Sequence, residues 1–319
     1  MRQVLSTFAL LLAMLGWSSN AHAQFRSEIY PIKTRSLSAM QFLNGKVDGP
    51  DAIVGGELRI PRFGEDRFPA VVLVHGSGGV ASNVTDWAIE LNKLGFVVFI
   101  LDSFTGRGIT NTMADQSQVS TYAMLDDAYR ALEILSKHPR VDPKRIAIMG
   151  FSKGAFASLY SALQRFNDSF APQGARFAAH IAFYGGCETA YIDDTKLTGA
   201  PVRLFHGLAD DYVPAAPCKD YVQRLKAAGA DVELFEYAGA HHAFDTRLPG
   251  AIPLPQAITI RKCRLEERPL GTIVNQETGK PLAMSDTCIG RGATIAPDAT
   301  ALEASRSEVA AFLKARFKM

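Results

Sequence analysis

The sequence lacks an excess of either charge sign, and beyond its first residues it has no long apolar run. Its 34 Lys and Arg residues are balanced by 32 Asp and Glu residues, so the formal net charge is +2 over 319 residues. Without runs of basic residues, this balance does not indicate a basic surface that would bind nucleic acid or an acidic membrane. No stretch after residue 23 reaches the roughly 20 apolar residues that a membrane-spanning helix needs, so no span is expected there.

Cysteine is scarce, and short metal-binding spacings are absent. The four cysteines are widely separated, with no C-x-x-C pair, so a zinc site is not expected. The Gly-rich segment at 75–79 lacks both the Gly-Lys-Ser/Thr of a P-loop and the spacing of a dinucleotide fingerprint. We therefore expect no metal and no cofactor.

Residues 1–23 have the pattern of a cleavable signal peptide. Arg2 precedes an apolar stretch at 8–15, and Ala21-His22-Ala23 supplies a small-residue cleavage site. The apolar stretch is too short to span a bilayer. We expect a mature chain, 24–319, that is secreted or periplasmic.

Export favours disulfides, because the compartment is oxidising and the cysteine count is even. Three connectivities are possible. We expect Cys187–Cys218, because Cys187 follows an apolar run, Cys218 follows the loop around Asp210, and both would lie at the carboxyl edge of neighbouring strands. We also expect Cys263–Cys288, because both lie in one irregular segment.

Apolar runs alternate with helical patterns along the mature chain. Strands are expected at 70–74, 96–101, 145–149, 179–184, 202–206 and 232–237, and helices at 84–94, 121–137, 154–165 and 217–228. Continuous apolar strands between helices indicate an α/β fold, with a mostly parallel sheet covered by helices on both faces. Residues 54–60 are expected to form an antiparallel edge segment.

The segment 246–299 interrupts this alternation. It is rich in Pro and Gly, and a last helix is expected at 301–317. Long irregular insertions in compact domains are often functional. Two interpretations stay open: a disulfide-pinned cap beside the active site, or a cover for the sheet edge.

The most informative motif is Gly150-Phe-Ser152-Lys-Gly154, which follows one predicted strand and opens a predicted helix. This is the context of a G-x-S-x-G nucleophile elbow, which presents a serine at a sharp turn. Asp210 and His242 follow two later strands, at the edge where parallel sheets bind ligands. The order Ser152, Asp210, His242 is typical of α/β-hydrolases, in which the imidazole activates the serine and the carboxylate orients the imidazole.

A developing oxyanion needs preorganised N–H donors. The residue after the nucleophile, Lys153, is expected to supply its backbone N–H. The second donor is expected from Ser77 in the loop 75–79, with Gly76 as the alternative. The side chain of Lys153 is expected to be solvated or structurally paired.

The chain resembles the dienelactone hydrolase family of the α/β-hydrolases over residues 70–245. The resemblance is carried by Val72-Leu-Val-His-Gly-Ser-Gly-Gly79, Leu101-Asp-Ser-Phe104, Gly150-Phe-Ser-Lys-Gly154, Gly207-Leu-Ala-Asp-Asp-Tyr-Val-Pro214 and Gly239-Ala-His-His-Ala-Phe244. It implies that Asp210 rather than Asp211 is the acid. It likewise implies that His242 rather than His241 is the base.

Two features depart from that family's pattern. Dienelactone hydrolases use a cysteine nucleophile, whereas this chain has Ser152. They also set two arginines against the substrate carboxylate, and Arg107 and Arg247 lie in the corresponding loops at different spacing. Arg107 is expected either to bind an anionic substrate group or to tie down its loop.

The sequence therefore predicts an exported serine hydrolase that cleaves a small-molecule carboxylic ester through an acyl-enzyme on Ser152. A peptidase or amidase of the same fold is an alternative, because the same three residue types cleave amide bonds. A non-catalytic binding protein is another. The sequence does not predict the oligomeric state.

Overall fold

The computed structural model describes residues 25–64 and 66–319. The predicted signal peptide, residues 1–23, lies outside the described residues. Within the described residues, no helix is long and apolar enough to cross a membrane.

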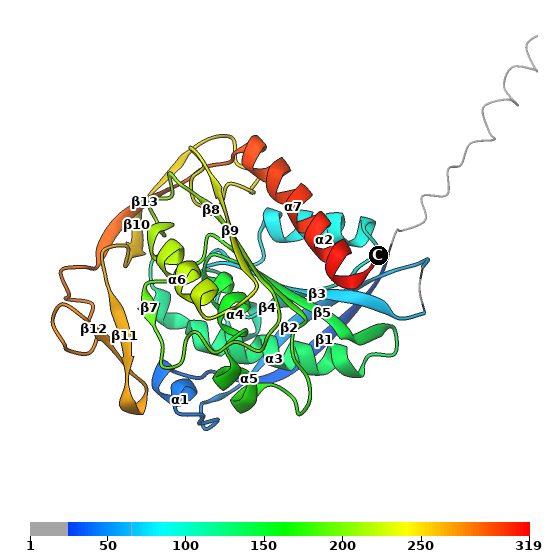
Figure 1. Cartoon of the computed structure of the whole chain (residues 1–319), viewed down its shortest axis with the longest axis horizontal. Coiled ribbons are helices and arrows are strands. Elements are labelled where there is room, and N and C mark those ends of the chain that lie inside the picture. Colours follow the sequence, from blue (N-terminus) through cyan, green and yellow to red (C-terminus); the bar gives the residue numbers. More distant parts are fainter. Residues whose placement is uncertain (1–24, 65) are drawn as a thin grey trace, which may run out of the picture.

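A twisted sheet of eight strands forms the centre of the molecule, in the order β1-β2-β4-β3-β5-β6-β8-β9 (Figure 1). The strands are β1 (Phe25–Arg35), β2 (Asp51–Pro61), β3 (Phe68–Val74), β4 (Val97–Asp102), β5 (Val141–Phe151), β6 (Ala179–Phe183), β8 (Val202–Gly207) and β9 (Val232–Tyr237). From β4 to β9 all neighbours are parallel, whereas β2 runs antiparallel to both β1 and β4. The predicted α/β-hydrolase fold, with a mostly parallel sheet, is confirmed.

Seven α-helices pack around this sheet in the described part of the chain. They are α1 (Ala39–Leu43), α2 (Ser82–Lys93), α3 (Thr121–Lys137), α4 (Lys153–Tyr160), α5 (Gln164–Phe170), α6 (Ala216–Ala227) and α7 (Ala299–Phe317). Short 3-10 turns lie at Thr105–Arg107, Gln116–Gln118 and Pro269–Gly271.

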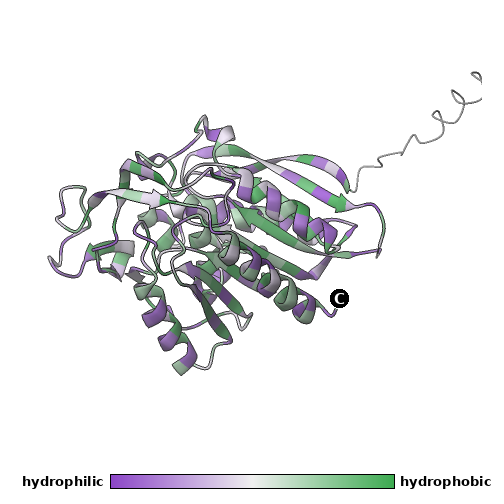
Figure 2. Cartoon of the chain, turned by 90° about the horizontal axis from the view of Figure 1, so that it is seen from above, coloured by the Kyte–Doolittle hydropathy of each residue, from purple (hydrophilic) through white to green (hydrophobic). Residues whose placement is uncertain are grey.

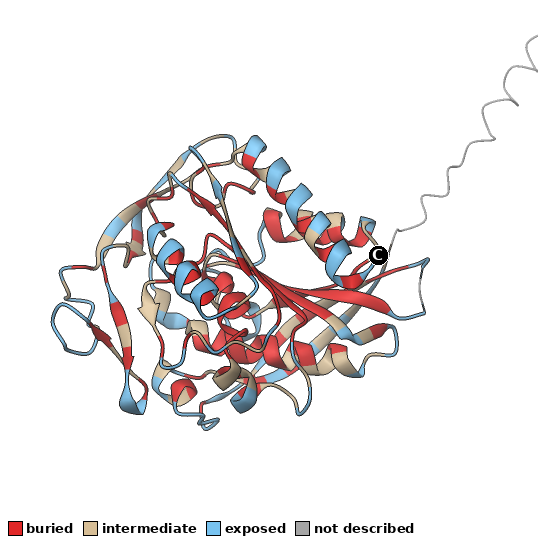
Figure 3. Ribbon diagram, in the orientation of Figure 1, coloured by how far each residue is buried: buried red, intermediate tan, exposed pale blue. Residues whose placement is uncertain are grey.

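The central strands are buried on both faces. On β3, Val72 and Val74 pack toward the core shared with α3, α4, α5 and α6, while Val71 and Leu73 pack toward α2 and α7. The apolar strands and their burial are visible in Figures 2 and 3. Two-sided burial explains why these strands read as unbroken apolar runs.

Three local predictions differ from the structure. The segment at 54–60 is part of β2, but the sheet edge is β1, in which only two of eleven residues are buried and which has no apolar run. The predicted helix at 154–165 is two helices, because Leu163 adopts an extended conformation and pairs with Leu197.

The segment 246–299 is also more regular than predicted. Strands β10 (Ile252–Thr259) and β13 (Gly290–Ile295) pair antiparallel, and β11 (Leu265–Arg268) and β12 (Thr272–Asn275) form a second antiparallel pair. A two-residue strand after β6, β7 (Thr189–Ala190), extends that second sheet. Prolines within β10 and the shortness of the other strands hide the alternation that would have revealed them.

Candidate active site

Ser152 occupies a strained turn between β5 and α4. Its φ and ψ are 51° and −117°, a conformation that non-glycine residues rarely adopt. The turn is held by a hydrogen bond from Ser152 N to Phe183 O, at 2.9 Å. A Cβ at Gly154 would lie 2.3 Å from the Val74 carbonyl oxygen, so only glycine allows α4 to begin this close to β3.

His242 lies in the loop after β9 and faces Ser152. Its Nε2 is 2.8 Å from Ser152 Oγ, and its Nδ1 is 2.8 Å from Asp210 Oδ2. A carboxylate on Nδ1 favours the tautomer with the proton there, which leaves Nε2 free to accept the serine proton. The structure thus brings the three residues singled out from the sequence into one hydrogen-bonded chain.

Asp210 is buried in the loop after β8. Its Oδ1 accepts hydrogen bonds from Tyr212 N at 2.9 Å and Val213 N at 2.8 Å. Burial opposes the charge, but His242 and His206, through their charges and hydrogen bonds, hold the pKa of the Asp210 carboxyl well below its ordinary value. The carboxylate therefore remains ionised beside the imidazole.

The neighbouring residues of the same types point elsewhere. Asp211 accepts hydrogen bonds from Thr294 N at 2.7 Å and Thr294 Oγ1 at 3.2 Å. The buried Nδ1 of His241 has no hydrogen-bond partner among the described residues.

The two segments expected to supply the oxyanion donors lie next to Ser152. The loop after β3 lies against the elbow, since a Cβ at Gly76 would be 3.2 Å from Ser152 Cβ. Buried His75 fixes this loop by donating from Nδ1 to Gly76 O at 2.7 Å and accepting from Ser103 N at Nε2, at 3.1 Å. Within the described part of the chain, the backbone N–H groups of Ser77 and Lys153 have no hydrogen-bond partner.

The side chain of Lys153 is buried rather than solvated. Its Nζ donates to Gln116 O at 2.8 Å, Gln116 Oε1 at 3.1 Å and Thr112 Oγ1 at 3.3 Å. Burial lowers the pKa of this ammonium to about 8. Ser77 Oγ donates to the same Gln116 Oε1, at 3.1 Å. Gln116 had no recognisable signal in the sequence, because it lies in a loop.

The two arginines considered for substrate binding are both engaged by carboxylates. The guanidinium of Arg107 pairs with buried Asp127 at 2.7 Å and also donates to Ser103 O and Arg35 O. These contacts favour the alternative in which Arg107 ties down its loop. Exposed Arg247 pairs with Asp86 of α2.

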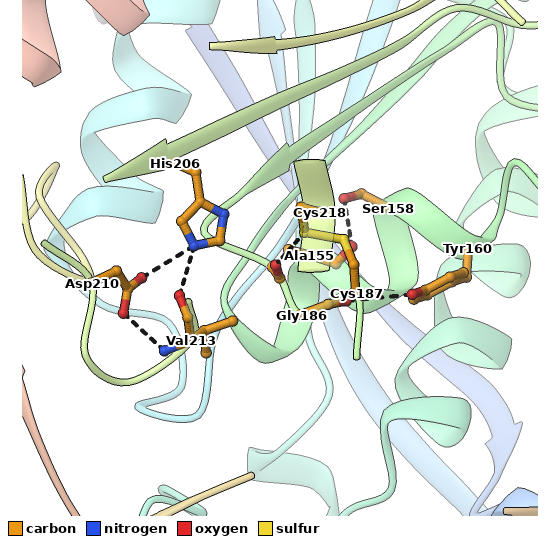
Figure 4. Close-up of a disulfide and its surroundings, with 10 residues drawn as sticks. Ala155, Ser158, Tyr160, Gly186, Cys187, His206, Asp210, Val213 and Cys218 are labelled. Carbon is orange, nitrogen blue, oxygen red and sulfur yellow. Dashed lines mark hydrogen bonds and ion pairs between the residues drawn. A yellow bond between two sulfur atoms is a disulfide. The ribbon is translucent and has the colours of Figure 1, made fainter. Parts of the chain in front are cut away.

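Both expected disulfides are present. Cys187 and Cys218 have Cα atoms 5.0 Å apart, and the bond joins the loop after β6 to the first turn of α6, near His206 and Asp210 (Figure 4). The second, Cys263–Cys288, lies inside the segment 246–299. The predicted pairing is confirmed.

The segment 246–299 is bonded to the loops that carry Asp210 and His242. Thr259 Oγ1 donates to Tyr212 O at 2.8 Å, and Thr294 holds Asp211. On the other side, Ile295 bridges to His242, and Ala296 N donates to His242 O at 3.2 Å. Over the described residues, no three His, Cys, Asp or Glu side chains are grouped so that they could hold a metal ion.

Comparison with known proteins agrees with this geometry. Residues 58–259, well over half of the chain, match the Dienelactone hydrolase family. A probable 2-oxo-3-(5-oxofuran-2-ylidene)propanoate lactonase from Bradyrhizobium sp. is 27% identical over 217 residues, covering 62% of this chain and 84% of that protein. A putative carboxymethylenebutenolidase from Yersinia pestis is 27% identical over 220 residues, covering 60% of this chain and 78% of that protein.

Solved structures show the same fold. A dienelactone hydrolase-like promiscuous phosphotriesterase from metagenomic libraries superimposes with a TM-score of 0.55 at 17% identity, covering 90% of this chain and 98% of that one. Together with the family match, which spans the elbow, the Asp210 loop and the His242 loop, this establishes that the chain is a hydrolase that belongs to the dienelactone hydrolase family of α/β-hydrolases.

Proposed function

We propose that this protein hydrolyses carboxylic esters through an acyl-enzyme formed on Ser152. The observation that carries the proposal is the continuous hydrogen-bonded chain from Ser152 Oγ through His242 to Asp210, with both links at 2.8 Å. Such a chain makes a serine hydroxyl nucleophilic at neutral pH.

In the first half-reaction, Ser152 Oγ attacks the carbonyl carbon while His242 Nε2 takes the hydroxyl proton. The carbonyl electrons move onto its oxygen, and the free N–H groups of Ser77 and Lys153 stabilise that oxyanion. Collapse of the intermediate breaks the ester C–O bond, and the alcohol leaves with the proton from Nε2. Water then repeats the sequence on the acyl-enzyme and releases the carboxylic acid.

Esters are favoured over amides as the substrate class. The two curated relatives described above are named as a lactonase and a butenolidase, and a lactone is a cyclic ester. The serine at the position of the family's cysteine leaves the same acyl-transfer chemistry available.

The test is to purify the mature protein and assay a panel of small esters beside matched anilides, with a serine-directed fluorophosphonate as a label. Ser152→Ala should abolish labelling and lower ester hydrolysis by on the order of 10⁴-fold or more, with the fold intact. His242→Ala and Asp210→Asn should cost orders of magnitude, and the matched controls His241→Ala and Asp211→Asn much less.

Near wild-type ester hydrolysis by Ser152→Ala would show that the nucleophile is another residue. A preference for anilides would favour the peptidase alternative. Absence of both labelling and turnover in the wild type would favour a binding protein.

We further propose that residues 1–23 are a cleaved signal peptide and that the protein is exported. Two disulfides within the described residues support this, because such bonds persist in oxidising compartments. Intact-mass analysis of the protein recovered from the extracellular or periplasmic fraction should give a chain that begins near Gln24. An uncleaved chain in the cytosol would contradict export.

A further inference from the structure

The imidazole of His242 is flanked by two tyrosine rings. The ring centroid of Tyr184 lies 4.7 Å from that of His242, and the ring of Tyr212 lies 4.9 Å away. All three side chains are buried. An aromatic face carries partial negative charge, so rings in this position favour the protonated imidazole that forms during catalysis.

Tyr184 is itself held by a buried carboxylate. Its hydroxyl donates to Asp245 Oδ1 at 2.7 Å and accepts from Asn83 Nδ2 at 3.1 Å. The other carboxylate oxygen, Asp245 Oδ2, accepts from Trp87 Nε1 at 2.8 Å. None of these four side chains takes part in the proposed acyl transfer.

The donors around Asp245 indicate that its carboxyl is ionised. An indole N–H can only donate, and the Tyr184 hydroxyl accepts from Asn83 and so gives its own proton to Asp245. Both carboxyl oxygens are therefore acceptors. Yet Asp245 is only 2% exposed, and no Lys, Arg or His of the described residues lies within ion-pair distance of it.

A buried carboxylate with only neutral partners is costly, and burial raises the pKa of Asp245 while its hydrogen bonds oppose that rise. The backbone around it is also constrained. Tyr184, directly after β6, has a φ of 40°, and Ala243, between His242 and Asp245, has a φ of 58°. Strain of this kind persists where the surroundings hold a residue in one position.

We propose that Asp245 and Tyr184 are positioning residues for His242: the carboxylate fixes the phenol, and the phenol ring holds the imidazole toward Ser152 and stabilises the imidazolium. Asp245 thus acts on the imidazole through the ring of Tyr184, whereas Asp210 acts on it through Nδ1. The inference rests on the proposed function for its catalytic meaning. The electrostatic coupling between Asp245 and the His242 imidazole can be measured without any substrate.

Several groups act on His242, and the direction of the effect follows from them. Asp210 contacts Nδ1, Ser152 contacts Nε2, Tyr184 and Tyr212 flank the ring, and His206 lies 3.5 Å from Asp210. Removing the negative charge of Asp245 leaves all of these in place. The protonated imidazole then becomes less favourable, so its pKa falls.

The experiment is a nitrogen-15 NMR titration of histidine-labelled protein, carried out on the wild type, Asp245→Asn and Tyr184→Phe. Tyr184→Phe keeps the ring, so it tests the hydroxyl with little loss of packing. Asp245→Asn should lower the pKa of the His242 imidazole by about half a unit or more, and both variants should lower kcat about tenfold with KM little changed. The acid limb of the pH profile should move in the same direction.

Trp87→Phe is the matched control, because it removes the other hydrogen bond to Asp245 and leaves the Tyr184 contact intact. It should lower the melting temperature without a comparable shift of the imidazole pKa. If Asp245→Asn lowers only the melting temperature and leaves that pKa unchanged, or if Tyr184→Phe leaves kcat unchanged, the pair is merely structural and the inference is wrong. Failure of the proposed function is separate: it would appear as ester hydrolysis that survives Ser152→Ala.

Discussion

At the scale of single residues, the least expected feature is the cation beside the nucleophile. Lys153 follows Ser152 directly, and its buried ammonium donates only to uncharged oxygens of Gln116 and Thr112. Through Gln116 it is linked to Ser77, so one charged group holds together the elbow and the loop of the second proposed oxyanion donor. A positive charge in this position also favours the developing oxyanion.

Lys153→Met should therefore lower kcat/KM by about ten- to a hundredfold at pH 7, since hydrogen bonds from a charged group contribute about 1.5–3 kcal/mol each. Because burial lowers the Lys153 pKa to about 8, the wild type should lose activity as the pH rises through that value and the charge disappears. The variant, which has no charge to lose, should lack this alkaline limb. The pH profile of kcat/KM for both proteins measures this loss of activity. Identical alkaline limbs in the two profiles would exclude Lys153 as the titrating group.

At the scale of elements, the segment 246–299 is joined to the catalytic loops at several points. Thr259 bonds the backbone of the Asp210 loop, Thr294 holds Asp211, and Ala296 bonds the backbone of His242. Ile258 N also reaches Met113 O, at 3.5 Å, in the loop that contains Gln116. These contacts favour the interpretation in which the segment is a cap, rather than the one in which it only covers the sheet edge.

Removing its internal disulfide should separate the two interpretations. A Cys263→Ala/Cys288→Ala variant should become sensitive to limited proteolysis within 246–299. The bond joins residues 25 positions apart, and closing such a loop contributes roughly 3–4 kcal/mol to the free energy of unfolding in the chain-entropy model. For a cap, the ratio of activities on long and short esters should change while fluorophosphonate labelling of Ser152 persists. An unchanged ratio with lower stability would leave only the covering role.

The sequence predicted elements that carry an apolar run or a helical period and missed those that carry neither. Strand β9 and helix α3 have the predicted bounds, at 232–237 and 121–137, because such a run and such a period identify them directly. Only two of the eleven residues of β1 are buried, and the strands of 246–299 are short or interrupted by proline, so no periodicity marks them.

The same distinction applies to the site. Ser152, Asp210 and His242 could be proposed as catalytic residues from the sequence because each follows a strand within a recognisable motif. Lys153 Nζ, Gln116, Tyr184 and Asp245 acquire their surroundings only when distant segments meet, as in the contact between Asp245 and Trp87, 158 positions apart. No local pattern encodes such a contact.

At the scale of the whole molecule, the proposed catalytic groups come from separate strand ends that must stay in register. The bond Cys187–Cys218 joins the loop after β6 to α6, which follows the Asp210 loop. It therefore ties the loop at the end of β6 to the helix that follows β8, the neighbouring strand in the sheet.

A Cys187→Ala/Cys218→Ala variant should lose roughly 3–4 kcal/mol of stability, because the bond closes a loop of 31 residues. Its kcat should also fall, by up to about a hundredfold, because small displacements of a catalytic group are costly. Denaturant unfolding and ester kinetics measure the two effects. If kcat is no more affected than in the Cys263→Ala/Cys288→Ala variant, the bond serves stability alone.

The backbone hydrogen bond between Ala296 and His242 affects the order in which the site can form during synthesis. Synthesis proceeds from the amino end, so Ser152 and Asp210 emerge before residues 295–298, of which Ile295 bridges to His242, and Ala296 and Asp298 donate to the backbone oxygens of His242 and Phe244. The loop of the proposed base therefore receives its full set of backbone contacts only after the chain has been made as far as residue 298. The proposed catalytic chain can assemble fully only from that point on.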